Sequence, residues 1–222
     1  MPILTQWAGT YLQRVDASGS FAKGTANRSG TDVDLFISLS PATTNTLQEI
    51  HDTLCQALTN AGYVPRRQNV SIGVRVGAID VDLVPGKQQN FLSLDHSLYR
   101  RKANTWTKTN VQTHIAHVQS NGRQMESRIL KLWRTQQGLD FPSFYLELAV
   151  IEALRKHSGP DLASRVWATL QYLAGNFSTA RIVDPANTNN VISDDLTVAE
   201  KLAIKAAAAQ SLQRKTWGEV VK

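Results

Sequence analysis

The chain has 222 residues, of which 42% are hydrophobic and 19% are charged, and its formal net charge is +6 at pH 7. This composition is typical of a globular protein with one large domain or two small lobes, and it excludes long disordered segments, collagen-like repeats and coiled coils. The single cysteine, Cys55, excludes an internal disulfide and a thiolate zinc cluster. Because the sequence shows no transmembrane-length apolar run and no signal-peptide pattern at its start, we expect a cytoplasmic protein with no membrane partner.

The first half of the chain is predicted to mix helices and strands. Apolar residues recur near helical spacing over residues 3–15, which predicts a helix. Residues 32–39, DVDLFISL, alternate between polar and apolar positions, which predicts a half-buried strand. Residues 43–61 carry apolar residues at intervals of three and four, which predicts an amphipathic helix. The β-branched segments 70–77 and 78–85 predict an antiparallel hairpin.

The second half of the chain has helical periodicity from about residue 109 onward. Strands followed by helices predict an α+β fold, with a mixed-sheet lobe over residues 1–108 and a helical lobe over residues 109–222. The helices are predicted over residues 109–120, 123–137, 142–156, 160–175 and 197–221.

Positive charge is concentrated in the middle of the chain. The segment 87–134 contains nine lysines and arginines but only two acidic residues, Asp95 and Glu126, so its charge is +7, and the rest of the chain has a charge of −1. This segment suits an anionic partner, either the triphosphate of a nucleotide or a nucleic acid.

Two pairs of aspartates are the candidate metal-binding residues of the sequence. Asp32 and Asp34 lie two apart in a predicted strand, so both carboxylates project from the same face. Asp80 and Asp82 repeat this spacing in a second predicted strand. Carboxylates this close repel one another unless a cation neutralises them, and Mg²⁺ prefers oxygen ligands. If the strands are adjacent, the aspartates can form a two-metal site for phosphoryl transfer; if not, they form an ordinary solvated strand face.

The segment SGSFAKGT precedes the first aspartate pair. Gly19 and Ser20 stand just before a predicted helix start, where backbone amides and a hydroxyl favour a phosphate. A Gly-Ser pair alone is weak evidence. Its combination with Gly24 and Thr25 and the following Asp-x-Asp strand is much more specific.

These motifs resemble a known superfamily. GSFAKGT, TDVDL and VDLVP are similar to the polymerase-β-type nucleotidyltransferases. Three later segments resemble the branch of oligoadenylate synthetases, cyclic GMP-AMP synthase and the bacterial dinucleotide cyclases of anti-phage signalling. They are RILKLWR (128–134), LDFPSFYLELAVIEAL (139–154) and VDPANTNNV (183–191). The resemblance runs from about residue 18 to the end, and it implies a nucleotidyltransferase fold with its active site in the cleft between the two lobes.

The resemblance implies which carboxylates are catalytic. Asp32, Asp34 and Asp82 match the metal-binding triad that holds two Mg²⁺ ions, or Mn²⁺ in their place. Asp80 falls two residues before the usual third acid, so we expect it to be a neighbour of the metal site and not a ligand.

The resemblance also implies nucleotide-binding residues. Gly19 and Ser20 match the triphosphate-binding turn, and Lys131 matches a helix lysine that contacts donor phosphates. Ser143 and Phe144 match a pair whose hydroxyl meets phosphate and whose ring stacks on the base; by themselves they predict only a helix cap and a core aromatic.

Arg128 is the last candidate for nucleotide binding. It stands three residues before Lys131 on the same predicted helix, and the two predict a cationic stripe over an apolar underside; as an alternative they are ordinary solvated surface charges.

Two features depart from the family pattern. Only eighteen residues precede Gly19, which is short for the helical leader of this branch, so the leader is either abbreviated or truncated. The single cysteine also excludes the zinc thumb with which cyclic GMP-AMP synthase grips DNA.

We therefore expect a metal-dependent nucleotidyltransferase that uses nucleoside triphosphates, above all ATP. It would join them to an acceptor nucleotide, release pyrophosphate and make a cyclic or linear oligonucleotide messenger. One alternative is nucleotide transfer onto tRNA or a protein, with the segment 87–134 as a nucleic-acid-binding face. Another is a nucleotide-binding module without catalytic activity. The sequence leaves the oligomeric state and any regulatory partner open.

Overall fold

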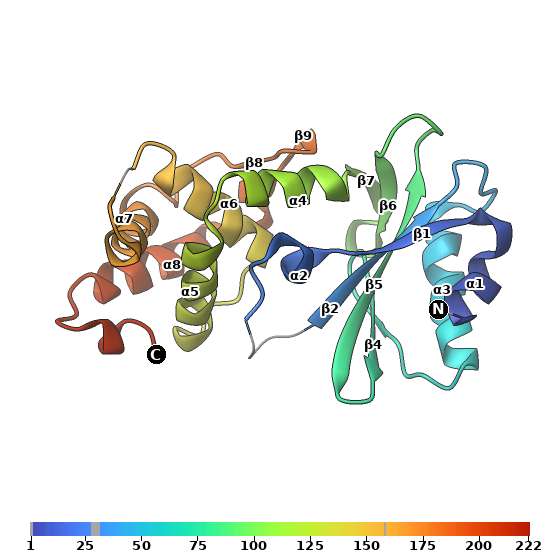
Figure 1. Ribbon diagram of the computed structural model, residues 1–222, viewed down its shortest axis with the longest axis horizontal. Helices are drawn as coiled ribbons and strands as arrows, with labels where there is room; N and C mark the ends of the chain where they lie inside the picture. The colour runs from blue at the N-terminus through green and yellow to red at the C-terminus, as the bar shows by residue number, and fades with distance from the viewer. Residues whose placement is uncertain (1, 28–31, 158) are drawn as a thin grey trace. The chain divides into compact units, whose positions relative to one another are not determined.

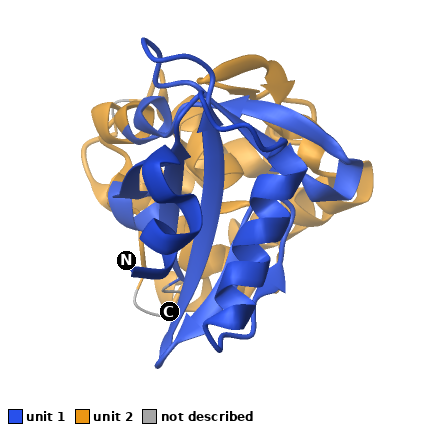
Figure 2. Cartoon of the chain, turned by 90° about the vertical axis from the view of Figure 1, so that its right-hand side faces the viewer, with its two compact units in different colours: residues 1–22, 28–115 blue, residues 23–27, 116–222 orange. Residues whose placement is uncertain are grey.

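The computed structural model describes residues 2–27, 32–157 and 159–222 (Figure 1). The chain divides into two compact units, shown in different colours in Figure 2. Unit 1 comprises residues 1–22 and 28–115, and unit 2 comprises residues 23–27 and 116–222. The predicted lobes, 1–108 and 109–222, had a single boundary, whereas the chain enters unit 2 briefly at residues 23–27 and returns to unit 1.

Unit 1 is built on a mixed sheet, seven-stranded in the described part of the chain. Its strands follow the order β1-β2-β5-β4-β3, and β6 pairs with β5 and β7. Strands β2 and β5 run parallel, and the other pairs are antiparallel. The strands are β1 Leu12–Ala17, β2 Asp32–Leu39, β3 Arg66–Arg67, β4 Ile72–Val76, β5 Ile79–Gln88, β6 His96–Arg100 and β7 Thr105–Thr109.

Two helices of unit 1, α1 (Pro2–Ala8) and α3 (Leu47–Asn60), lie side by side on one face of the sheet (Figure 1). Alternate residues of the strands point toward these helices, as a half-buried strand requires. The buried apolar cluster between them contains Leu4, Ala8, Ile37, Leu39, Ile50, Leu54, Cys55, Leu58, Ile72, Val74 and Leu83. The other sheet face therefore carries the side chains at the alternate positions, which include the aspartates.

The prediction of a helix over residues 3–15 is wrong beyond Tyr11. Helix α1 is followed by a 3-10 turn, Gly9–Tyr11, and the chain then becomes strand β1. Val15, one of the apolar positions that predicted the helix, instead pairs with Ile37 of β2, and Leu12 pairs with Leu39. Pairing with a distant strand overrides the local periodicity, since the ladder satisfies backbone groups that a helix would otherwise satisfy internally.

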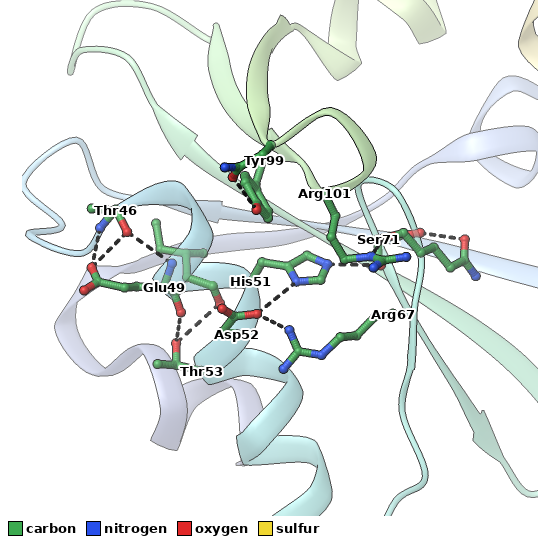
Figure 3. Close-up of polar contacts among 12 residues, drawn as sticks. Thr46, Glu49, His51, Asp52, Thr53, Arg67, Ser71, Tyr99 and Arg101 are labelled. Atoms are coloured by element: carbon green, nitrogen blue, oxygen red, sulfur yellow. Dashed lines mark hydrogen bonds and ion pairs between the residues drawn. The ribbon is translucent and has the colours of Figure 1, made fainter.

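Helix α3 begins at Leu47, four residues after its predicted start, because a capping box defines its first turn (Figure 3). The Thr46 hydroxyl accepts a hydrogen bond from the Glu49 amide at 3.2 Å, and the Glu49 carboxylate accepts one from the Thr46 amide at 2.7 Å. One turn later, Asp52 forms an ion pair with Arg67 of β3. This pair joins the helix to the edge of the sheet.

The hairpin predicted over residues 70–85 is confirmed as β4 and β5, with Val76 opposite Ile79. Strands β3, β6 and β7 were not predicted. Strand β3 has only two residues, both arginines, and β6 and β7 carry His96, Arg100 and Lys108 among their apolar positions. Their strand conformation depends on pairing with distant segments, and a local pattern gives no sign of it.

Unit 2 is helical, as predicted. Its buried cluster contains Leu130 and Trp133 from α5, Tyr145 and Leu146 from α6, and Leu170 from α7, all at most 1% exposed. The segment 183–191, read as a turn, forms the hairpin β8–β9. Helix α4 begins in unit 1 and ends in unit 2. The elements are α4 Val111–Ser120, α5 Gln124–Gln136, α6 Ser143–Leu154, α7 Leu162–Gly175, β8 Val183–Asp184, β9 Asn187–Val191 and α8 Val198–Ser211.

Within the described ranges, the helices are all too short or too polar to span a bilayer.

Candidate active site

Four aspartates meet on one face of the unit 1 sheet. In the parallel pair β2–β5, Asp32 lies opposite Asp80 and Asp34 lies opposite Asp82. Since side chains alternate along a strand, all four carboxylates project to the face away from α1 and α3. The adjacency of the two Asp-x-Asp strands, which the sequence left conditional, is therefore present in the fold.

The turn at Gly19 and Ser20 lies directly against this cluster. The Ser18 amide donates to the Asp34 carbonyl at 2.8 Å, which holds the start of α2 (Gly19–Lys23) on strand β2. A Cβ on Gly19 would lie 1.6 Å from Asp34 Oδ2, and the Gly19 φ angle is +57°. Only glycine fits this position, because any side chain would take the place of the carboxylate and would strain the backbone.

The carboxylate of Asp82 has a perturbed pKa. Its pKa is raised, first by burial and then by the negative charges of Asp34 and Asp32. The Gln68 amide opposes this shift by donating to Asp82 Oδ1 at 2.8 Å. Gly73 of β4 leaves room for this contact, since a Cβ there would lie 2.9 Å from Asp82 Oδ1.

Asp80 has a different environment from the other three. Two arginines flank it, with Arg66 Nη2 at 3.2 Å from Oδ1 and Arg75 Nη1 at 3.7 Å from Oδ2. The charge of Asp80 is thus already partnered by protein cations.

The chemistry of the triad suits a hard divalent cation. Asp32, Asp34 and Asp82 supply oxygen donors on one sheet face, and burial together with the charges of Asp34 and Asp32 raises the pKa of Asp82. A bound Mg²⁺ or Mn²⁺ would relieve the repulsion between these charges. In the described residues, His, Cys, Asp and Glu side chains do not converge in threes as a preformed metal site. The aspartates fit the ion by their oxygen donors and by their placement on one sheet face.

The predicted nucleotide-binding residues of unit 2 occupy contrasting environments. Arg128 is exposed, whereas Lys131 is 6% exposed, so the alternative of an ordinary solvated surface charge is wrong at Lys131. Ser143 is the first residue of α6, after an N-cap at Pro142. The ring of Phe144 lies under the Lys23 ammonium, 4.7 Å from its centroid.

Lys131 belongs to a buried charge cluster that the sequence analysis missed. Its ammonium donates to Glu147 Oε1 at 2.6 Å, and Lys23 Nζ lies 2.5 Å from Glu147 Oε2. Burial raises the pKa of Glu147, but the charges of the two lysines outweigh it, so the pKa lies below its ordinary value. A signal was available, since Glu147 is an isolated acid in the apolar run FYLELAVI.

Gln68, Arg66 and Arg75 were also missed. They reach Asp82 and Asp80 through the pairing of β3, β4 and β5, and no spacing in the sequence indicates this pairing.

No protein-family model matches the chain. In sequence, the chain is similar to the cyclic AMP-AMP-AMP synthase of Escherichia coli (strain MS 115-1), with 25% identity over 209 residues that cover 82% of this chain and 64% of that protein. The chain therefore spans slightly less than two thirds of the length of this relative.

In structure, the chain is similar to CdnC of E. coli MS115-1, solved with ATP, with a TM-score of 0.76 and 22% identity over 99% of this chain and 86% of that one. It is also similar to DncV of Vibrio cholerae, a cyclic AMP-GMP synthase and prokaryotic cGAS homolog, with a TM-score of 0.67 and 16% identity over 93% of this chain and 66% of that one. The predicted resemblance and α+β fold class are confirmed: this chain has the fold of the cGAS/DncV-like nucleotidyltransferases and is related to synthases of cyclic oligonucleotides.

Proposed function

We propose that the chain is a metal-dependent nucleotidyltransferase that uses ATP and makes a cyclic oligonucleotide. The observation that carries this proposal is the parallel register of β2 and β5, which aligns Asp34 with Asp82 beside the Gly19 turn. The names of the relatives support the class of product. A role in defence signalling, as in the resembling branch, is part of the proposal.

In the proposed reaction, a ribose hydroxyl oxygen of the acceptor nucleotide attacks the α-phosphorus of the donor triphosphate. The new P–O bond forms as the bond to the β-phosphate oxygen breaks, and pyrophosphate leaves. Asp82 orients the acceptor hydroxyl, and its carboxylate oxygen receives the proton. Divalent ions held by Asp32, Asp34 and Asp82 would supply charge neutralisation for the phosphates.

The triphosphate would lie against Gly19 and Ser20, whose backbone amides and hydroxyl donate hydrogen bonds without adding charge. On the strength of the resemblance, we propose that Lys131 and Ser143 contact the donor phosphates, and that the Phe144 ring stacks on the donor base. Phenylalanine retains the stacking surface and lacks the hydroxyl of the commoner tyrosine. Arg128 is a further candidate for nucleotide binding because it stands three residues before Lys131 on α5.

Mass spectrometry of the products formed from the four nucleoside triphosphates with Mg²⁺ tests the proposal. We expect pyrophosphate and a cyclic oligonucleotide that contains adenosine. The double variant Asp32→Asn, Asp34→Asn should form neither, although it retains the size and shape of both side chains. Product formation by this variant at the wild-type rate would rule out the assignment of the triad.

The same assay with labelled ATP, with and without tRNA, distinguishes the acceptor. We propose a nucleotide as acceptor, and several charges of the segment 87–134 already have acidic partners. Lys108 lies 3.3 Å from Asp95, and Lys131 lies 2.6 Å from Glu147. Label that appears in tRNA and not in small molecules would replace this proposal with macromolecular transfer.

A further inference from the structure

The buried carboxylate of Glu147 holds three segments of unit 2 together. Glu147 is 0% exposed, and Lys23 and Lys131 are each 6% exposed. Glu147 lies on α6 and Lys131 on α5, while Lys23 and Thr25 belong to the segment 23–27, which packs in unit 2. Charges are rarely buried so completely unless each has a partner, because desolvation of an unpaired charge is costly.

The two oxygens of Glu147 have separate partners. Oε1 accepts from Lys131 Nζ at 2.6 Å and from the Thr25 hydroxyl at 2.5 Å, while Oε2 lies 2.5 Å from Lys23 Nζ. Lys131 completes the cluster by donating to the Thr25 carbonyl at 3.1 Å and to its hydroxyl at 2.9 Å. Glu147 therefore holds the side chains of Lys23 and Thr25, and Lys131 holds the Thr25 backbone.

The far end of the same segment has its own attachment. The Asn27 side-chain amide donates to the Arg128 carbonyl of α5 at 2.9 Å. The segment 23–27 is thus held against the helices of unit 2 at Lys23, Thr25 and Asn27, each time by a side-chain contact with α5 or α6.

The segment 23–27 lies in the chain between the Gly19 turn and the strand that begins at Asp32. Four residues before Lys23 is Gly19, which begins the turn that our proposed function assigns to the triphosphate. Five residues after Asn27 is Asp32, which begins the strand of the proposed metal ligands. A short segment held at three points restricts the conformations open to the turn that precedes it.

We propose that Glu147 is a positioning residue for nucleotide binding. It contacts neither substrate nor metal; it fixes the end of α2 through Lys23 and Thr25, and it fixes the ammonium of Lys131. The ligand whose binding Glu147 supports is the triphosphate of a nucleotide, so this inference rests on the proposed function. Loss of the Glu147 charge leaves two buried lysines without a counterion and releases the segment 23–27 from α6.

The first test compares Glu147→Gln with Glu152→Gln. Both residues lie on α6, but the Glu152 side chain is 43% exposed and forms an ion pair with Arg155, which is 66% exposed. We expect Glu147→Gln to raise the KM for ATP about tenfold or more, with a smaller effect on kcat, because a misplaced binding group weakens substrate positioning. Glu152→Gln should match the wild type.

The second test keeps the proposal falsifiable if Glu147→Gln does not fold. Thr25→Val retains the shape of the side chain and removes only the hydroxyl, whereas Thr25→Ser retains the hydroxyl. Hydrogen exchange should accelerate in peptides covering residues 19–27 of Thr25→Val and stay at the wild-type rate in Thr25→Ser, with the KM for ATP following the same order.

The inference is overturned if folded Thr25→Val keeps the wild-type exchange rate over residues 19–27, or if Glu147→Gln folds and keeps the wild-type KM. Hydrogen exchange requires no turnover. Consequently, a wild-type chain that binds no ATP contradicts the proposed function, while the exchange data still decide whether the cluster fixes this segment.

Discussion

Gly19 and Asp34 share a space that is large enough for only one side chain. A Cβ on Gly19 would lie 1.6 Å from Asp34 Oδ2, so the turn and the carboxylate lie together only because residue 19 has no side chain. This contact couples the proposed phosphate-binding turn to a proposed metal ligand. Filling the space at Gly19 should affect catalytic activity and folding stability to different extents, and a matched pair of glycine substitutions can distinguish the two effects.

Gly19→Ala should reduce pyrophosphate release by about a hundredfold or more, since a displacement of about 1 Å in a catalytic group has an effect of this size. The matched control is Gly77→Ala in the β4–β5 turn, where φ is +61° but a Cβ would meet nothing within 4 Å. Both variants should lose about 1 kcal/mol of stability from the left-handed backbone. Only Gly19→Ala should lose activity; equal activity losses would contradict the contact.

Asp82→Asn and Asp80→Asn should have unequal effects, although the two residues lie on the same strand and face. Asp82 is a proposed metal ligand, so its loss should lower pyrophosphate release more than about a hundredfold. Asp80 already pairs with Arg66 and Arg75, and its substitution should change the rate less than about threefold. Steady-state kinetics at saturating Mg²⁺ measures both, and a larger loss in Asp80→Asn would reverse the assignment.

Added Mg²⁺ should stabilise the folded chain, because a ligand that binds only the native state raises the unfolding free energy. The chelator EDTA should remove this gain and abolish pyrophosphate release. The urea midpoint should rise with Mg²⁺ in the wild type and stay constant in Asp32→Asn, Asp34→Asn. A midpoint that responds equally in both proteins would place the ion elsewhere.

Stability should fall as the pH is lowered from about 7.5 to about 5.5, through the ordinary histidine pKa. Burial is the main cause that lowers the pKa of both His51 and His96 in the folded state. Below the unfolded pKa of 6.5, the unfolded chain therefore binds protons that the native chain does not, and protonation favours unfolding.

Urea denaturation across this range measures the effect. Asp82, whose pKa is raised, works in the opposite direction because its folded form retains a proton to higher pH. The comparison is therefore cleanest in Asp82→Asn, where replacement of His51 and His96 by glutamine should remove most of the slope. An unchanged slope in that protein would exclude the two histidines as its source.

Thr46→Ala should cost about 1 kcal/mol of stability, since it removes the hydroxyl that caps α3. The capping box is exposed and lies on the helical side of the unit 1 sheet, so nucleotide turnover should stay at the wild-type level. Thr46→Ser, which keeps the hydroxyl, is the control. Reduced turnover in Thr46→Ala would mean that modest destabilisation alone lowers activity, and the Gly19 comparison would need correction for it.

The amino-acid sequence by itself determined the elements whose signals are local. The alternation in DVDLFISL predicts β2 and places Asp32 and Asp34 on one face, and helical spacing predicts α3 and the helices of unit 2. The motifs around Gly19 and the aspartates also identified the family resemblance before any geometry was available. These signals succeed because period and turn chemistry are properties of a few consecutive residues.

Only the tertiary structure decided which distant residues meet. The register of β2 with β5, the arginines on Asp80 and the attachment of Lys23 and Thr25 to Glu147 all join segments far apart in the chain. For the same reason, the sequence predicts a helix where strand β1 lies, and it gives no sign that Lys131 is buried. The local pattern of Lys131 is the same for an exposed lysine and a buried one, and the difference is a carboxylate sixteen residues away on another helix.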